Sequence, residues 1–182
     1  MRFAYLDIET DYLGKHADER LFRDYENHRI TVLGVRIVEE NRDDFYQLIE
    51  QEVSKDALLR ILAGVQTLVT YNGRSIPDRI KRRVGFDFPV IAAQLGIVLD
   101  QEFKHKDLVP ECWARGLYGG QKKVEESLGL KRKLPGKDGA WATAMWREYQ
   151  RTGAKEHLDQ LLLYNREDVF MLREIELKLE KR

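Results

Sequence analysis

Two acidic residues interrupt an apolar run near the start of the chain, in the sequence FAYLDIET (residues 3–10). Side chains alternate between the two faces of a strand, so we expect Asp7 and Glu9 to project side by side from one face. Neighbouring carboxylates repel each other, and burial penalises both charges. A divalent cation that prefers hard oxygen ligands, such as Mg²⁺ or Mn²⁺, would give both acids a partner. The alternative is a strand that ends in solvent and carries two ordinary surface acids.

A second unusual acid occurs late in the chain, in LLLYNREDVFML (residues 161–172). Helical spacing places it on a mostly apolar stripe, which consists of Leu161, Asn165, Asp168, Leu172, Ile175 and Leu179. An isolated buried carboxylate is costly, so Asp168 would need a strong partner. Tyr164 lies four residues earlier, over the same patch of helix surface. The alternative is a polar edge of a surface helix, formed by Asn165 and Asp168.

A third candidate acid lies between these two segments. The run TLVTYNG (residues 67–73) indicates a short buried strand that ends in a turn at Asn72 and Gly73. Asp87 precedes an apolar helical segment at residues 88–96. The structural interpretation is that Asp87 caps this helix. The functional interpretation is that Asp87 lies at the mouth of the helix and faces the sheet.

The elements that must position these acids follow a mixed order of strand and helix patterns. Strand patterns occur at residues 3–10, 30–40, 44–50 and 67–73, and a further strand beginning near residue 105 runs into a helix that reaches residue 113. Helix patterns occur at residues 54–64, 88–96, 119–129, 140–153 and from about 155 to the end. The polar stretch 11–29 is expected to be a long connection with room for a short helix. This order predicts the α/β class, with one mixed central sheet flanked by helices.

Composition limits the possible classes of protein. Of the 182 residues, 43% are hydrophobic and 34% are charged, with a formal net charge of zero, which is typical of a soluble globular protein and not of a disordered or fibrous one. The single cysteine, Cys112, excludes an intrachain disulfide and a cysteine-based metal site. No signal-peptide pattern or membrane-spanning apolar run is present, so a cytoplasmic location without membrane association is expected. No repeat, linker or composition shift divides the chain, so residues 1–182 are predicted to form one domain.

The three acidic segments, taken in order, resemble the DEDD exonucleases. The shared features are Asp7-x-Glu9, an acid that follows an Asn-Gly strand end, and Tyr164-x-x-x-Asp168 in a late helix. The tyrosine is similar to that of the DEDDy subclass, because the histidine subclass has its histidine at the position of Leu163. The phrases TYNGRS, FDFPVI and YNREDV resemble the bacterial family of predicted ribonuclease-H-like exonuclease domains.

This resemblance implies a ribonuclease H-like fold and a 3′–5′ exonuclease that uses two divalent ions, Mg²⁺ or Mn²⁺. It implies that Asp7 bridges the two ions, whereas Glu9 and Asp168 hold the ion that carries the nucleophilic water. Asp87 would serve the other ion, and Tyr164 would orient the water. Two such ions stabilise the attacking and leaving oxygens of an in-line displacement at phosphorus. The implied substrate is the 3′ end of single-stranded DNA or RNA, and the product is a nucleoside 5′-monophosphate.

The chain departs from the family pattern between its second and third acidic motifs. The segment IPDRIKRRVG (residues 76–85) is inserted between NGRS and FDFPVI. Asp78 is therefore a rival for the middle acid, since it lies nearer to Asn72. The Phe-Asp pair and the apolar helix after it favour Asp87, whereas Asp78 lies in a basic, proline-containing segment that is typical of a loop.

Phosphates would need cations near such an acidic pocket. The inserted segment supplies the candidate phosphate contacts Arg79, Lys81, Arg82 and Arg83. Thr10 and Asn72, which adjoin the acidic segments, complete the candidate substrate-binding set. Further cations occur at residues 122–123 and 131–133, and a solvated surface position is the preferred interpretation for any single one of them.

Two other functions compete with the exonuclease. One is a non-catalytic module of the same fold that binds nucleic acid or a partner protein. The other is an endonuclease that acts on a structured junction. The complete set of acids together with Tyr164 favours catalysis, and the tyrosine-bearing helix favours an exonuclease.

Overall fold

The computed structural model describes residues 1–15, 23–74 and 84–181. The strands are β1 (Phe3–Tyr12), β2 (His28–Glu39), β3 (Arg42–Ile49), β4 (Thr67–Thr70) and β5 (Lys104–Asp107). The α-helices are α1 (Lys55–Ile61), α2 (Asp87–Leu95), α3 (Leu99–Glu102), α4 (Leu108–Ala114), α5 (Gln121–Ser127), α6 (Gly139–Thr152) and α7 (Lys155–Glu180). Short 3₁₀ helices are η2 (Tyr25–Asn27) and η3 (Glu50–Glu52).

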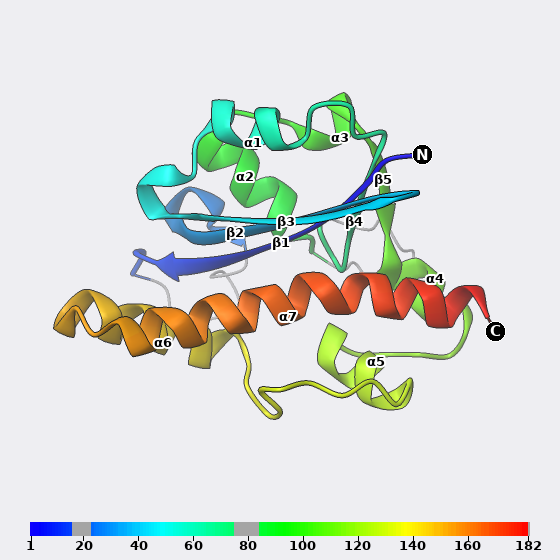
Figure 1. Ribbon diagram of the computed structural model, residues 1–182. Helices are drawn as coiled ribbons and strands as arrows, with labels where there is room; N and C mark the ends of the chain where they lie inside the picture. Colours follow the sequence, from blue (N-terminus) through cyan, green and yellow to red (C-terminus); the bar gives the residue numbers. More distant parts are fainter. Residues whose placement is uncertain (16–22, 75–83, 182) are drawn as a thin grey trace.

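The strands form one five-stranded sheet in the order β3-β2-β1-β4-β5. The first three strands in the chain pair antiparallel, whereas β1, β4 and β5 run parallel. Helices α1, α2 and α3 cover one face, and α7 crosses the other face together with α4, α5 and α6 (Figure 1). The expected α/β class with a mixed sheet flanked by helices is therefore confirmed.

Strand β1 extends beyond its parallel neighbour. Its pairing with β4 joins only Phe3–Tyr5 to residues 67–69, whereas its pairing with β2 continues to Tyr12. From Leu6 onward, no described residue pairs with β1 on its β4 side. Strand ends of this kind leave a crevice in which open α/β sheets bind ligands.

The polar stretch 11–29 is not simply a connection, contrary to expectation. Strand β1 continues to Tyr12 after a register shift between Glu9 and Thr10, and Tyr12 pairs with His28 at the start of β2. Asp11 is compatible with this longer strand because two arginines neutralise it. Arg147 Nε lies 2.9 Å from its carboxylate, and Arg29 lies 3.5 Å from it.

The two faces of β1 contribute to different parts of the core. Ala4, Leu6 and Ile8 pack in the cluster that contains residues of α1 and α2. Tyr5, on the opposite face, packs in the cluster that contains residues of α7. This alternation places Asp7 on the same face as Tyr5, as the sequence predicts, and the structure shows that this face packs against α7.

Helix α7 lies unusually close to the sheet above Asp7. All six residues of the predicted stripe are buried. Gly34 pairs with Asp7 across β1 and β2, and a Cβ atom at this glycine would lie 2.3 Å from Asn165 Oδ1 and 2.8 Å from Val169 Cγ2. The missing side chain at residue 34 therefore lets α7 approach the strand that carries the first acids. None of the helices within the described ranges is long and apolar enough to cross a membrane.

Candidate active site

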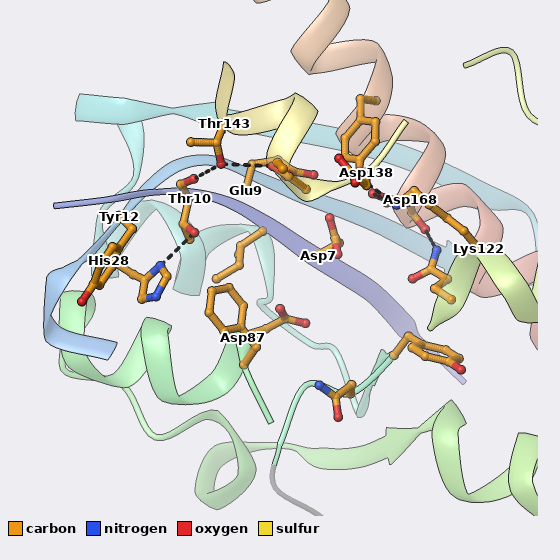
Figure 2. A pocket seen from close by; sticks show the side chains of 18 of the residues that line it. Asp7, Glu9, Thr10, Tyr12, His28, Asp87, Lys122, Asp138, Thr143 and Asp168 are labelled. Carbon is orange, nitrogen blue, oxygen red and sulfur yellow. Dashed lines mark hydrogen bonds and ion pairs between the residues drawn. The ribbon is translucent and has the colours of Figure 1, made fainter. Parts of the chain in front are cut away.

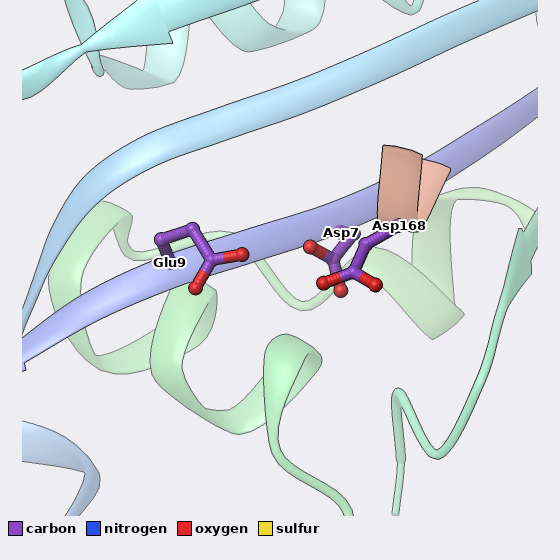
Figure 3. Close-up of side chains that lie close together, drawn as sticks. All are labelled: Asp7, Glu9 and Asp168. Atoms are coloured by element: carbon purple, nitrogen blue, oxygen red, sulfur yellow. The ribbon is translucent and has the colours of Figure 1, made fainter. Parts of the chain in front are cut away.

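Three carboxylates from two distant segments meet between β1 and α7. Ligand oxygens of Asp7, Glu9 and Asp168 all lie within 4.8 Å of one another. Figure 3 shows the Asp7 and Asp168 carboxylates close together, with the Glu9 carboxylate directed toward them along β1. The three acids are close enough to share a cation, so this cluster could bind a metal ion.

Both surface alternatives for these acids fail. Glu9 is only 8% exposed, so the strand does not end in solvent at this point. Asp168 is 5% exposed and Asn165 is fully buried, so the two residues do not form the edge of a surface helix. Asn165 instead donates a hydrogen bond from Nδ2 to Asp7 Oδ2, at 3.1 Å.

Asp87 lies on the opposite wall of the same cavity. Figure 2 shows its carboxylate pointing into the space beside Asp7. Asp87 is the first residue of α2 and is buried, but it is not one of the three tightly clustered acids. Phe86 occupies the N-cap position, and within the described residues no donor is hydrogen-bonded to the Asp87 carboxylate. The helix-cap interpretation therefore does not account for this acid.

The turn after β4 fixes the position of Asp87. The backbone N–H groups of Phe86 and Phe88 donate to the carbonyl groups of Asn72 and Gly73, at 3.1 and 2.9 Å. Asn72 has a left-handed backbone, with φ of 67°, and its N–H donates to Asp107 Oδ1 at 2.9 Å. Asn72 thus lines the cavity and ties the end of β4 to the start of α2.

Negative charge is undercompensated in this cavity. Burial raises the pKa of Asp7 well above its ordinary value, and the charge of Asp168 raises it further. Burial and the charge of Asp7 raise the pKa of Glu9, and the same two causes raise the pKa of Asp87. A cluster of buried hard oxygen donors with raised pKa values is chemically suited to Mg²⁺ or Mn²⁺.

The nearby cations concentrate on one of the four acids. Lys122 Nζ lies 3.3 Å from both carboxylate oxygens of Asp168, and Arg132 forms ion pairs with Asp168 and Glu125. Among the described residues, Glu9 and Asp87 have no ion-pair partner. Sequence reasoning missed these roles, because it favours solvated surface positions for Lys122 and Arg132.

Tyr164 lies beside this cluster and is 2% exposed. Its hydroxyl accepts a hydrogen bond from Lys122 Nζ at 2.7 Å, and its ring packs against Trp141 with centroids 5.6 Å apart. Burial raises the pKa of Tyr164 above its ordinary value, and the charges of Asp168 and Glu9 act in the same direction. In the metal-free protein these effects favour the protonated form of the Tyr164 hydroxyl.

The acids open into a cavity of about 900 Å³. This volume lies within the range of small-molecule binding sites, about 300–1,000 Å³. Thr10 lines the cavity, and its hydroxyl lies 3.1 Å from Nδ1 of His28. His28 contacts the rings of Tyr12 and Phe86, each at a centroid distance of 4.9 Å, and all three residues line the cavity. One part of the wall is therefore acidic and another part is aromatic.

Other candidates from the sequence lie outside the described residues. These are the rival acid Asp78 and the basic residues of the inserted segment, Arg79, Lys81, Arg82 and Arg83. Val84, which is near the end of that segment and is its first described residue, lines the cavity. The inserted segment therefore ends beside the acidic cluster.

Comparison with known proteins supports the fold. A family model of the RNase_H superfamily, RNase_H_2, matches residues 4–179. No curated protein matches the sequence. The matched region includes β1, the turn after β4 and α7, and so contains all four acids of the cavity. Since the match spans almost the whole chain and the sheet has the order β3-β2-β1-β4-β5, the chain belongs to the RNase H superfamily.

Proposed function

We propose that the protein is a metal-dependent 3′–5′ exonuclease of the DEDDy type. It would hydrolyse phosphodiester bonds of single-stranded DNA or RNA and release nucleoside 5′-monophosphates. The observation that carries this proposal is the convergence of four acids and a tyrosine in one cavity, namely Asp7, Glu9, Asp87, Tyr164 and Asp168. Membership of a superfamily that consists mostly of nucleases supports a nucleic-acid substrate.

The donor set fits two divalent ions, Mg²⁺ or Mn²⁺. Asp7, Glu9 and Asp168 would hold one ion, since their oxygens cluster within 4.8 Å. Asp87 and Asp7 would hold the second, because they face each other across the cavity. When bound, such ions acidify water and neutralise the charge that develops on a phosphodiester during in-line displacement.

The chain itself orients the reacting groups in this proposal. Tyr164 stays protonated and donates its hydroxyl hydrogen to the attacking water or to a phosphate oxygen. The rings of Tyr12, His28 and Phe86 provide a surface on which a terminal base could stack, an interaction worth about 1–3 kcal/mol per base. Thr10 and Asn72 border the space for the terminal nucleotide, and the basic residues 79–83 contact the backbone phosphates.

The proposal is tested with 5′-labelled single-stranded DNA and RNA oligomers, incubated with Mn²⁺, Mg²⁺ or EDTA. We expect a ladder that shortens from the 3′ end and disappears in EDTA and in the Asp7→Asn and Asp168→Asn variants. Asp159→Asn is the matched control, because Asp159 lies on the same helix but is exposed. This control should leave the ladder unchanged.

Two outcomes would replace the proposal. Failure of the wild type to release mononucleotides from either polymer, with either metal, would favour the non-catalytic binding module. Cleavage of a circular single strand, which has no 3′ end, would establish an endonuclease.

A further inference from the structure

Lys122 reaches the acidic cluster from an element that contributes none of the acids. It lies in the first turn of α5, and two hydrogen bonds from neighbouring segments fix this turn. Gln121 Nε2 donates to the backbone carbonyl of Asp168 at 2.9 Å, and the hydroxyl of Tyr71 donates to the carbonyl of Gly119 at 2.8 Å. The position of Lys122 is therefore set by the fold around it.

The contacts of Lys122 join two residues of the proposed site. Its ammonium lies 2.7 Å from Tyr164 Oη, 3.3 Å from both oxygens of Asp168 and 4.5 Å from the centre of the Tyr164 ring. An ammonium group only donates hydrogen bonds, so the tyrosine oxygen is the acceptor. The hydroxyl hydrogen of Tyr164 is therefore directed elsewhere, and in the described part of the chain it has no other partner. It is free to donate into the cavity.

Charge neutralisation explains the ion pair of Lys122 with Asp168 but not its hydrogen bond to the Tyr164 hydroxyl. Arg132, which is almost completely buried, already forms an ion pair with Asp168. The side chain of Lys122 is one-third exposed, at 33%, and lines the cavity. The ammonium is therefore partly hydrated, whereas the Asp168 carboxylate that it pairs with is buried. Pairing with Asp168 alone would not require the ammonium also to lie 2.7 Å from the Tyr164 oxygen.

We propose that Lys122 is a positioning residue, which holds the Tyr164 hydroxyl as a hydrogen-bond donor and fixes the Asp168 carboxylate beside it. This inference rests on the proposed exonuclease function and specifies how Tyr164 acts in it. Lys122 would act through these two side chains without itself being a metal ligand.

The kinetic test compares Lys122→Met with Lys123→Met. Lys123 packs its aliphatic chain along Gly119 and does not line the cavity, so its variant controls for loss of a lysine from α5. Misplacement of a reacting group by about 1 Å can reduce the rate about 100-fold, so we expect kcat of Lys122→Met to fall about 10- to 100-fold. KM should change less than about threefold, because the proposed role of Lys122 is to orient reacting groups and not to bind the substrate. Lys122→Arg, which keeps the charge and the donors, should restore part of the loss.

A double variant tests whether Lys122 acts through Tyr164. If it does, Lys122→Met/Tyr164→Phe should lose no more activity than the more damaging single variant, because coupled residues are not additive. Multiplicative losses, a change confined to KM, or a kcat equal to that of Lys123→Met would each overturn the proposal.

A binding measurement without catalysis separates positioning from a general structural role. Mn²⁺ is titrated into each variant at pH 8 and followed by electron paramagnetic resonance. Removing a positive charge beside Asp168 should tighten Mn²⁺ binding about three- to tenfold, even though turnover falls. Weaker Mn²⁺ binding by Lys122→Met would show that the site has collapsed and would contradict the proposal.

The role of Lys122 can also be tested if the protein is not an exonuclease. If the wild type degrades no substrate, the Mn²⁺ affinities and the urea unfolding midpoints still report on the contact. The midpoint shift of the double variant should then be smaller than the sum of the two single shifts. Additive shifts together with an unchanged Mn²⁺ affinity would overturn the role of Lys122.

Discussion

Helix α7 presents two buried acids to the same strand, and their surroundings differ sharply. Glu176 faces Tyr5, whereas Asp168 faces Asp7, two residues further along β1. Glu176 accepts hydrogen bonds from Tyr5 Oη, from Lys106 Nζ at 2.8 Å and from Arg173 at 2.8 Å. Asp168 also has two cationic partners, Lys122 and Arg132, but these serve a group of three carboxylates, because Asp7 and Glu9 lie within 4.8 Å of it.

The pKa shifts follow these surroundings and not burial alone. Burial raises the pKa of Glu176, but hydrogen bonds from Lys106, Tyr5 and Arg173 outweigh it, and the net shift is downward. Burial also raises the pKa of Asp7, and there the charge of Asp168 adds to it. One helix and one strand thus carry a fully paired structural acid and an underpaired acidic cluster. A candidate metal site is therefore distinguished less by the burial of its carboxylates than by how few hydrogen-bond and ion-pair donors each carboxylate has.

Neutralising an acid in the cluster should have the largest effect on activity. Asp7→Asn removes a proposed metal ligand that contributes several kcal/mol to the transition state, so we expect a loss of about 1,000-fold or more in kcat/KM. The same change removes carboxylate repulsion, so the metal-free variant should be more stable than the wild type by about 1 kcal/mol at pH 8. Urea unfolding in EDTA measures the second effect. If Asp7→Asn loses stability as well as activity, the acids of the cluster do not destabilise the metal-free protein, and the contrast with Glu176 is wrong.

Displacing α7 from the strand should have the next largest effect. Gly34→Ala places a Cβ atom against Asn165 and Val169, so the helix must shift. Overpacking of this kind costs about 1–3 kcal/mol, and a shift of Asp168 by about 1 Å could reduce kcat about 100-fold. Unfolding and kinetic measurements on one preparation test both effects. Wild-type activity in Gly34→Ala would show that the close approach of α7 is unimportant for the site.

At the paired end of α7, the expected pattern is reversed. Glu176→Gln removes the negative charge and one of the two acceptor oxygens that Lys106 and Arg173 share, and we expect stability to fall by about 1–3 kcal/mol. Activity of the folded variant should stay within about twofold of wild type, because Glu176 is remote from the cavity. Glu180→Gln is the control, since Glu180 is exposed on the same helix. If Glu176→Gln is fully folded but has lost most of its activity, Glu176 is not a purely structural acid and the contrast with Asp168 is wrong.

The smallest expected effect is a difference in pH dependence. In the metal-free protein, the raised pKa values of Asp7, Glu9 and Asp87 mean that the folded state binds more protons than the unfolded state above about pH 4. Unfolding free energy should therefore fall as pH rises from about 4.5 to 8, by about 1 kcal/mol or more for this cluster. Asp7→Asn should flatten this slope.

Glu176 should behave in the opposite sense. Its lowered pKa contributes stability above the unfolded value, and this contribution is lost as pH falls through the folded value. Glu176→Gln should therefore alter the acid side of the profile and leave the slope between pH 5 and 8 unchanged. Equal slopes for wild type and Asp7→Asn in urea unfolding with EDTA would contradict the assigned shifts.

The sequence predicts the parts of the site that depend on local periodicity. Alternation along β1 places Asp7 and Glu9 on one face, and helical spacing places Asp168 on the buried stripe of α7. Both follow from the repeat of the element itself. Which acids meet depends on the order of the strands in the sheet, and local spacing does not determine that order.

The remaining parts of the site arise from long-range packing. Lys122 and Arg132 belong to segments whose charge patterns are typical of a solvated surface, and only the docking of α5 and the loop after it against α7 brings them to Asp168. Gly34 did carry a signal, because an isolated glycine within a strand often marks the close approach of another backbone. The length of β1 was underestimated, since the arginines that neutralise Asp11 come from β2 and α6.

We expect the underpaired cluster, and not the paired acid, to bind divalent metal. Calorimetric titration of Mn²⁺ at pH 8 into the wild type, Asp7→Asn and Glu176→Gln measures this difference. We predict that wild type and Glu176→Gln bind Mn²⁺ equally, and that Asp7→Asn binds at least about tenfold more weakly. Equal binding by wild type and Asp7→Asn, or no binding by the wild type, would contradict this expectation.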